Sequence, residues 1–108
     1  MTPSPGEIWL ADIPFTDGSA SKIRPVLVLW LDAADVVVAA VTSAPPRSAT
    51  DVILVDWELE GLRVTSTVRL SRLDCMEQIL LRRKLGSLSS NDAQRLKEVW
   101  TSRIQLRF

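Results

Sequence analysis

The fold is decided by one stretch near the middle of the chain, RPVLVLWL (24–31), DAAD (32–35) and VVVAAVTS (36–43). Two runs of apolar, mostly β-branched or leucine residues flank a short segment of small and acidic residues, which is the pattern of a β-hairpin. Neither run alternates strictly between apolar and polar residues, so we predict that the hairpin is buried on both faces. The connecting segment contains no glycine, which disfavours the tightest two-residue turn.

Further strand patterns surround this hairpin. The run 65–73 alternates apolar and polar residues, as in a half-exposed strand. Two polar segments are expected: a loop at 16–22, and a turn or single helical turn at 56–62. We expect the remaining strands at 7–15, 51–55, 65–73 and 79–88.

The end of the sequence indicates a helix. Ser89 and Asp92 have the spacing of a capping box. Apolar residues then recur at helical intervals, namely Ala93, Leu96, Val99, Trp100 and Ile104. Five or six short strands with one terminal amphipathic helix predict a mainly β fold with a C-terminal α-helix. Closure into a small barrel would remove exposed strand edges.

Length and charge limit the possible functions. A chain of 108 residues is enough for a single domain, 1–108, and too short for two ordinary ones. Apolar residues make up 46%, which suffices for one core. Thirteen basic side chains balance thirteen acidic ones. A general polyanion-binding surface is therefore not indicated, and binding to nucleic acid would need a local basic patch.

The sequence contains no histidine and one cysteine, Cys75. Without histidine, His-based acid–base pairs, HExxH zinc sites and Cys/His metal clusters are excluded, so neither a metal nor another cofactor is expected. One cysteine cannot form an internal disulfide, which fits a reducing cytosol. We expect Cys75 to be a small, half-buried residue rather than a nucleophile, since no histidine can activate it.

No targeting segment is evident. The first residues, MTPSP, lack the basic and apolar regions of a signal peptide. No apolar run approaches the roughly 20 residues that span a bilayer. We therefore expect a cytoplasmic protein without a membrane partner.

Polar residues stand at one end of the predicted hairpin. Arg24 enters the first strand, and Thr42 and Ser43 leave the second. A two-residue turn would place Arg24 opposite Ser43, and one more loop residue would place it opposite Thr42. Cross-strand neighbours lie about 5 Å apart at Cβ, close enough to grip one phosphate. Spacing alone fits a solvated arginine and ordinary strand-end hydroxyls slightly better.

Five blocks of sequence, in order, resemble the PemK/MazF toxin family over almost the whole chain. The first combines GEIWL (6–10), PFTD (14–17) and KIRPVLVL (22–29). The others are VTS (41–43), GL (61–62), STVRL (66–70) and RKLGSLS (83–89). The resemblance implies an SH3-like barrel, usually dimeric, that cleaves single-stranded RNA at short sequences without metal and is restrained by a cognate antitoxin.

The same resemblance implies roles for individual residues. Arg24 corresponds to the family's catalytic arginine and Thr42 to its catalytic threonine, while Arg69 matches an arginine that some members use. Two departures are present. The first loop, GSAS (18–21), lacks the histidine of some members, and Ser71 stands where others carry aspartate.

The chemistry can be stated from the residue types. The 2′-hydroxyl of RNA is the nucleophile, so the protein must align it, stabilise charge on the phosphate and move two protons. Arg24 suits charge stabilisation because its fork matches phosphate oxygens and stays protonated. The Thr42 hydroxyl can orient the phosphate or the attacking group. The candidate bases are Asp17, Asp12 and Asp74.

Other residues receive binding roles. Lys22, Ser43, Arg69, Arg83 and Lys84 are candidates for contacts with RNA, although a solvated strand face explains 82–84 equally well. Trp9, Trp30 and Trp100 are assigned to the core. Trp57, in a polar segment, is the best exposed aromatic candidate, either for base stacking or as an anchor for the antitoxin.

Two other functions remain open. Gyrase-poisoning toxins share this barrel and act by binding a protein, and fold alone does not separate the classes. The pairing of Arg24 with Thr42 and Ser43 favours the nuclease, because a binding poison does not need it. An adaptor that has lost activity is the third possibility.

Overall fold

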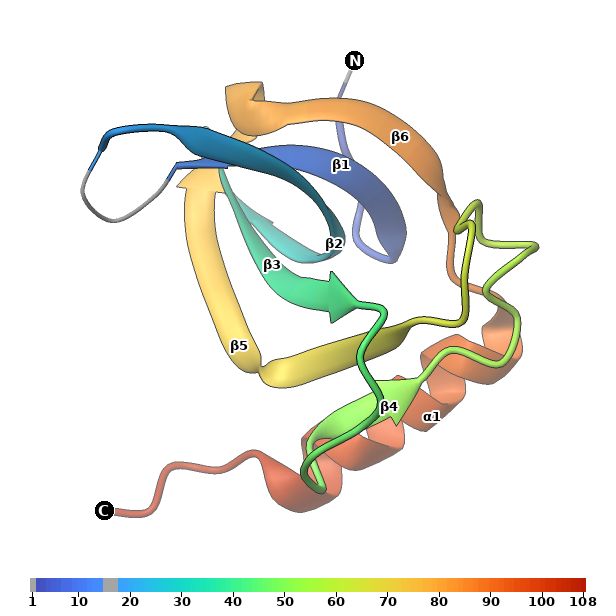
Figure 1. The fold of residues 1–108 in the computed structure, drawn as a ribbon. Helices are drawn as coiled ribbons and strands as arrows, with labels where there is room; N and C mark the ends of the chain where they lie inside the picture. Colours follow the sequence, from blue (N-terminus) through green and yellow to red (C-terminus); the bar gives the residue numbers. More distant parts are fainter. Residues whose placement is uncertain (1, 15–17) are drawn as a thin grey trace.

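The computed structural model describes residues 2–14 and 18–108, and within them six antiparallel strands form one sheet (Figure 1). The chain order is β1 (Glu7–Pro14), β2 (Ser21–Asp32), β3 (Asp35–Thr42), β4 (Asp51–Ile53), β5 (Thr67–Glu77), the 3-10 turn η1 (Gln78–Leu80), β6 (Leu81–Ser87) and α1 (Ser90–Arg103). This arrangement confirms the prediction of a mainly β fold with one C-terminal helix.

The sheet is strongly curved and roughly barrel-like, but it is not closed. The strand order is β4-β5-β3-β2-β1-β6, so β4 and β6 are its two edges in the described chain. The expected closure is therefore wrong. The edges are protected in other ways: β4 has three residues and lies against α1, where Arg95 donates to the Ile53 carbonyl at 2.6 Å, and β6 carries charged side chains.

The central hairpin differs from the prediction in its turn. β2 and β3 are joined by two residues, with Asp32 paired to Asp35 and Ala33 at φ 54°. The glycine-free sequence therefore does adopt the tight turn. Gln78 stabilises it, because its Nε2 donates to the Ala33 carbonyl at 3.0 Å and its backbone N–H donates to the Ala34 carbonyl at 3.1 Å.

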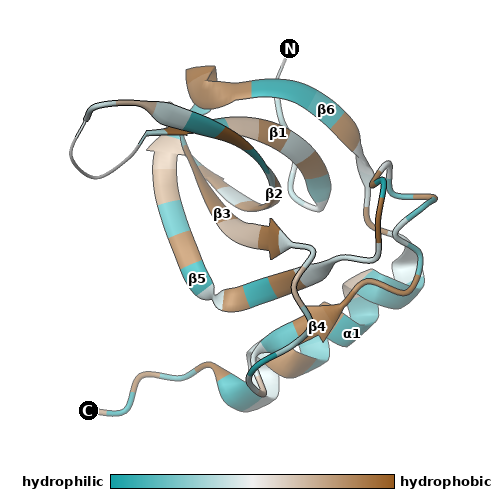
Figure 2. Ribbon diagram, in the orientation of Figure 1, coloured by the Kyte–Doolittle hydropathy of each residue, from teal (hydrophilic) through white to brown (hydrophobic). Residues whose placement is uncertain are grey.

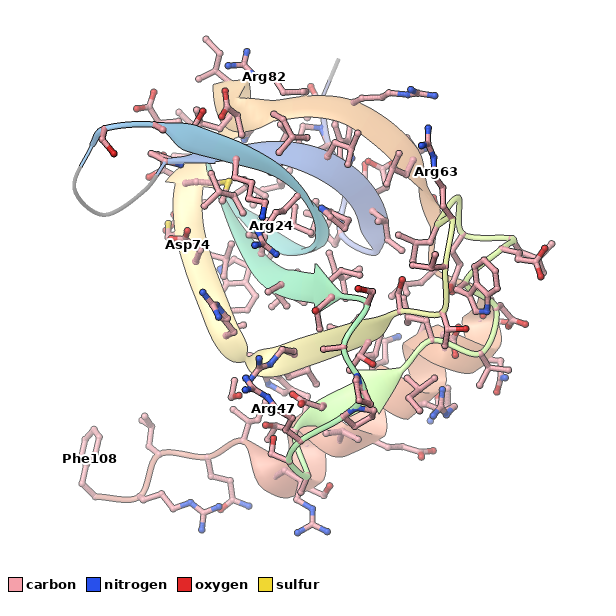
Figure 3. The ribbon with its side chains drawn as sticks, viewed as in Figure 1. Arg24, Arg47, Arg63, Asp74, Arg82 and Phe108 are labelled. Atoms are coloured by element: carbon pink, nitrogen blue, oxygen red, sulfur yellow. The ribbon has the colours of Figure 1, made fainter. Side chains whose placement is uncertain are left out.

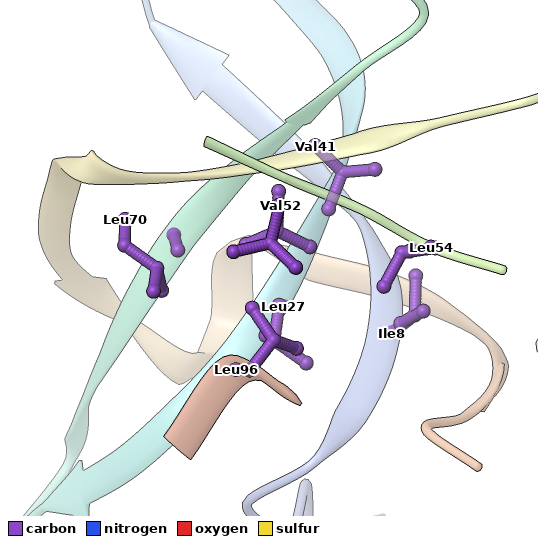
Figure 4. Packing of buried hydrophobic residues seen from close by; sticks show 9 residues of the cluster. Ile8, Leu27, Val41, Val52, Leu54, Leu70 and Leu96 are labelled. Atoms are coloured by element: carbon purple, nitrogen blue, oxygen red, sulfur yellow. The ribbon is translucent and has the colours of Figure 1, made fainter. Parts of the chain in front are cut away.

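Both faces of the curved sheet are buried near its centre, as predicted for the hairpin. Consecutive residues Val26, Leu27 and Val28 of β2 are all buried. Val26 and Val28 belong to a cluster inside the curve of the sheet, and Leu27 to a second cluster beneath α1. Figure 4 shows Leu96 of α1 beside Leu27 within this second cluster.

Several strand boundaries differ from the predicted ones. β2 begins at Ser21, inside the expected 16–22 loop, and β4 ends at Ile53 rather than at residue 55. β5 continues to Glu77 and bends at 70–72, where the partner of β3 residue Ala39 is Leu73 but that of Ala40 is Arg69. β6 begins only after the turn η1. Hydrophilic bands on β5 and β6 mark where these strands face solvent (Figure 2).

The helix begins as predicted. Ser89 is its N-cap, and the Ser89 hydroxyl accepts from the Asp92 N–H at 3.1 Å. The second half of the capping box is different. The backbone N–H of Ser89 donates to Glu60 Oε2 at 2.8 Å. Glu60 of the 55–61 turn therefore accepts the bond that a capping box assigns to the side chain of Asp92.

Candidate functional site

Arg24 lies near the start of β2 and is exposed. It pairs with Ala11 of β1 on one side. On the other side the β2–β3 ladder runs as far as Val26 opposite Ala40. Two residues further on, the same register sets Arg24 opposite Thr42. Arg24 projects from β2 on the side of the sheet that β3 and β5 frame (Figure 3).

A bulge in β2 produces this register. The tight turn begins the ladder with Asp32 opposite Asp35, which alone would lead to Ser43 opposite Arg24. The register then shifts between Val28 and Trp30, so that Leu29 is the extra residue of β2. The strand itself, and not a longer loop, therefore brings Thr42 to Arg24.

Thr42 ends β3 and pairs with Thr67 of β5. It is half-buried, and its Oγ1 accepts the backbone N–H of Ala44 at 3.2 Å. A hydroxyl that accepts this bond keeps its own hydrogen available to donate. Ser43 is exposed just beyond the strand.

Arg69 of β5 lies on the same face of the sheet as Arg24 and Thr42. It is opposite Ala40, two residues before Thr42, and opposite Asp51 on the other side. Residues paired directly across antiparallel strands share a face, as do residues two apart along a strand. Lys22, exposed and two residues before Arg24, extends the face on β2.

Asp51 and Arg69 form an ion pair at 3.6 Å between Oδ1 and Nε. The Asp51 side chain is 1% exposed and that of Arg69 20%. Neither of the two facing atoms has a hydrogen-bond partner among the described residues. Asp51 Oδ2 accepts the backbone N–H of Arg47 at 2.9 Å.

The three candidate bases are placed differently. Asp12 lies opposite Ile23, and therefore on the other face from Arg24, with its Oδ2 2.9 Å from Arg82 Nη2. Hydrogen bonds from the Ser21 and Arg82 side chains hold the pKa of Asp12 below its ordinary value. Asp74 is exposed on β5 opposite Val38. Asp17 lies outside the described residues.

The basic run on β6 does not join the Arg24 site. β1 separates β6 from β2. Lys84 Nζ lies 2.9 Å from Glu7 Oε2, and Arg82 is paired with Asp12 as described above. Arg83 is exposed and has no ion pair within the described part of the chain.

Two assignments of tryptophan side chains are wrong. Trp57 is half-buried and packs against the cluster beneath α1, so it is not the exposed aromatic of the turn. Trp30 is 44% exposed, because the bulge at Leu29 turns it outward. The rings of Trp30 and Trp100 meet edge to face with centroids 6.1 Å apart. They help to line an apolar cavity of about 550 Å³ between β2 and α1, away from Arg24, Thr42 and Arg69.

Cys75 is exposed on β5, which overturns the half-buried assignment. Desolvation and the nearby carboxylates of Asp35, Asp32 and Asp74 raise the pKa of its thiol. A thiol with a raised pKa forms less thiolate and is a weaker nucleophile at neutral pH.

The described residues have neither a metal-binding cluster nor a membrane-spanning helix. They contain no group of three or more His, Cys, Asp or Glu side chains that could hold a metal ion. No helix among them is long and apolar enough to cross a membrane.

The family is decided by a match to the profile of PemK-like, MazF-like toxins of type II toxin–antitoxin systems, which spans residues 4–101. The chain belongs to this toxin family.

Solved structures agree with this membership. The Mycobacterium tuberculosis toxin MazF-mt6 is 27% identical, with a TM-score of 0.74 over 94% of this chain and 99% of that one. An endoribonuclease from a mycobacterial species has the same fold at 17% identity, with a TM-score of 0.75 over 100% and 96% of the two chains. Another, solved in complex with its cognate antitoxin, is 17% identical, with a TM-score of 0.77 over 99% of each chain. No curated protein sequence matched. A gyrase poison finds no support in these matches.

The sequence did not indicate two residues beside Arg24, Thr42 and Arg69, which together form the polar face of the toxin. Asp51 begins β4, and Thr67, which is buried, faces Thr42. Asp51 lies on β4, whose partner β5 is distant in sequence. Thr67 pairs with Thr42 in a ladder that a bulge interrupts, so sequence spacing alone does not give the pairing. An acidic residue just before an apolar strand was the available signal for Asp51, and it is too common to single the residue out.

Proposed function

We propose that this toxin is a metal-independent, sequence-specific endoribonuclease that cleaves single-stranded RNA by attack of the RNA's own 2′-hydroxyl. The observation that carries the proposal is the face shared by Arg24, Thr42 and Arg69 at one end of β2, β3 and β5. Its support is threefold: the family, the endoribonuclease neighbours and residue types suited to phosphate chemistry.

The reaction forms one bond and breaks one. The 2′-oxygen bonds to phosphorus as the bond from phosphorus to the 5′-oxygen of the next nucleotide breaks, which gives a cyclic phosphate and a free 5′-hydroxyl. One proton leaves the 2′-hydroxyl and another reaches the 5′-oxygen. The Arg24 guanidinium stabilises the charge that develops on the phosphate oxygens. Thr42, whose hydroxyl hydrogen is free to donate, orients a phosphate oxygen.

Asp17 is proposed as the acid or base, because it precedes β2 in the sequence and because Asp12 and Asp74 are less suitably placed. Asp12 is paired with Arg82 on the opposite face, and Asp74 lies beyond the bend of β5. Lys22 and Ser43 would bind phosphates next to the cleaved one. Arg83 and Lys84 would bind RNA that continues past β1 to β6.

The proposed partners are a cognate antitoxin and a second copy of the chain. One structural neighbour was solved with its cognate antitoxin, which supports the first. A groove made by two copies would hold a longer RNA segment than one small sheet can, which supports the second. Trp57 remains a proposed antitoxin contact through its exposed part only. The proposed location is the cytoplasm, where RNA and antitoxin are present.

The deciding experiment incubates the purified protein with a long single-stranded RNA and maps the cut ends in excess chelator. We expect cuts at a short recurring sequence, with cyclic phosphate and 5′-hydroxyl ends. The pH–rate profile should lack the inflection near about 6.5 that a histidine gives. A 5′-phosphate product, or activity that requires added magnesium, would show metal-assisted attack by water.

A further inference from the structure

The ion pair between Asp51 and Arg69 has an unusual geometry for two groups that are so well shielded. Asp51 Oδ1 and Arg69 Nε are both buried, face each other at 3.6 Å and have no hydrogen-bond partner in the described chain. A typical N–H···O bond is about 2.9 Å long, so the atoms are about 0.7 Å short of forming one. Asp51 and Arg69 therefore attract each other by charge, without a hydrogen bond between these two atoms.

The contact engages only one edge of the guanidinium. Nε is the inner donor, and the outer Nη groups carry four further N–H donors. No hydrogen bond or ion pair of those Nη groups is found within residues 2–14 and 18–108. The two Nη groups of Arg69 therefore remain available to bind two phosphate oxygens, while Asp51 faces Nε.

Asp51 is itself firmly held. Its Oδ2 accepts the Arg47 N–H at 2.9 Å, and its backbone N–H donates to the Ser48 carbonyl at 3.1 Å. Both partners belong to the 43–50 segment, which follows Thr42. One carboxylate therefore contacts the segment leaving Thr42 and the arginine on the adjacent strand.

We propose that Asp51 is a positioning residue of the RNA-cleaving site: it holds Arg69 through Nε, so that the Nη donors face the phosphate backbone of bound RNA. This rests on the proposed function. A phosphate on the Nη groups and Asp51 at Nε would hold the guanidinium from two sides, so phosphate binding would change the surroundings of the Nε–H. The backbone link to Arg47 would keep the segment after Thr42 in register with Arg69.

Charge and positioning predict opposite effects of Asp51→Asn. Loss of a negative charge beside a phosphate site should strengthen RNA binding if electrostatics alone matters. Loss of the anchor should weaken it, because Arg69 is no longer held. The first test therefore measures the affinity for an RNA oligonucleotide with a 2′-deoxy nucleotide at the cleavage site, which binds without being cut.

The experiment is a double-mutant cycle of Asp51→Asn, Arg69→Ala and the double variant, with folding checked by circular dichroism. We expect Asp51→Asn to weaken binding about fivefold alone and less than about twofold in the Arg69→Ala background, since coupled neighbours are not additive. Arg69→Ala should also reduce the salt slope of binding by about 0.7, the value for one phosphate contact to a single strand. Arg69→Lys should not restore affinity, because lysine has no Nε donor.

A second readout does not depend on how the variants fold. In the wild-type protein, the ¹⁵N-resolved Arg69 Nε–H resonance should move when the 2′-deoxy oligonucleotide is added. An unmoved resonance, tighter binding by Asp51→Asn, or equal losses in both backgrounds would overturn the positioning role. A wild-type protein that neither binds nor cuts single-stranded RNA would instead remove the proposed function, and the positioning role with it.

Discussion

Glu60 and Asp92 are two fully buried acidic side chains that lie together where the 55–61 turn meets the first turn of α1, and each shifts the pKa of the other. Asp92 accepts the backbone N–H groups of Val55 at 3.1 Å and Asp56 at 2.9 Å, and Arg95 Nη1 lies 3.0 Å from it. Among the described residues, Glu60 accepts only from Ser89, and its Oε1 has no donor. Two neighbouring buried carboxylates repel each other, so Glu60, which has fewer donors than Asp92, is the one that takes up a proton.

The pH dependence of stability follows from this proton. Burial, and then the neighbouring Asp92, raise the pKa of Glu60 from 4.5 to about 7, although the Ser89 N–H opposes the shift. Between these values the folded protein binds more protons than the unfolded chain. The free energy of unfolding should therefore fall as pH rises through this window, by up to about 1.4 kcal/mol per pH unit.

Urea denaturation at pH 5, 6, 7 and 8 measures this slope. Glu60→Gln is the control, because its amide can donate to Asp92 and its oxygen can accept from Ser89 without a titrating proton. The variant should show a flatter profile across the window. A slope that is the same in both proteins would assign the pH dependence to other groups.

The tight packing of the same turn predicts a steric effect. A Cβ at Gly86 would clash with the backbone carbonyl of Glu60, and a Cβ at Gly61, which has φ +87°, would clash with that of Leu85. Gly86→Ala should therefore destabilise the protein by about 1–3 kcal/mol, the range for overpacked sites. Ser87→Ala is the comparison, since this exposed neighbour on β6 gains no atom and loses only its hydroxyl. Equal melting temperatures for the two variants would contradict the predicted clash.

The sequence could predict the elements of the fold better than their connections. The hairpin, the half-exposed strand and the Ser89 cap follow from local patterns. The turn at Ala33 does not, because Gln78, far along the chain, supplies its hydrogen bonds. The bulge at Leu29 was equally hidden, since a run of apolar residues contains nothing that marks one of them as unpaired.

That bulge also explains why the candidate site was only partly predictable. Two registers were open, and hairpin arithmetic alone could not choose between Ser43 and Thr42 as the neighbour of Arg24. The bulge selects Thr42 and, by the same shift, exposes Trp30. The position of Asp51 beside Arg69 depends on the pairing between β4 and β5, which no local sequence pattern indicates.

Catalysis provides the direct test of the polar face. Arg24→Ala should lower the rate of RNA cleavage by about 10²–10³, the cost of losing one charge-stabilising donor. The fold should not change, because Arg24 is exposed. Thr42→Ala should cost less, since Ser43 or water can replace its hydroxyl. Single-turnover cleavage assays measure both, and exposed Arg107→Ala is the matched control. Full activity in a correctly folded Arg24→Ala protein would refute the assignment.

Assembly is the last prediction, and it concerns the apolar surface beside α1. Trp30 is exposed at the edge of the cavity between β2 and α1, and it contacts Trp100. Exposed aromatic surface next to an apolar cavity favours burial against another protein surface, and a symmetric pair is the commonest closed assembly. We expect a homodimer by light scattering at micromolar concentration, and Trp30→Ser should shift it toward monomer. Leu59→Ser, at an exposed leucine, should not.

An antitoxin peptide that binds tightly should also stop RNA cleavage, because RNA and antitoxin are expected to compete for the Arg24 end of the sheet. A monomeric wild-type protein would refute the first expectation, and a peptide complex that still cuts RNA at the normal rate would refute the second.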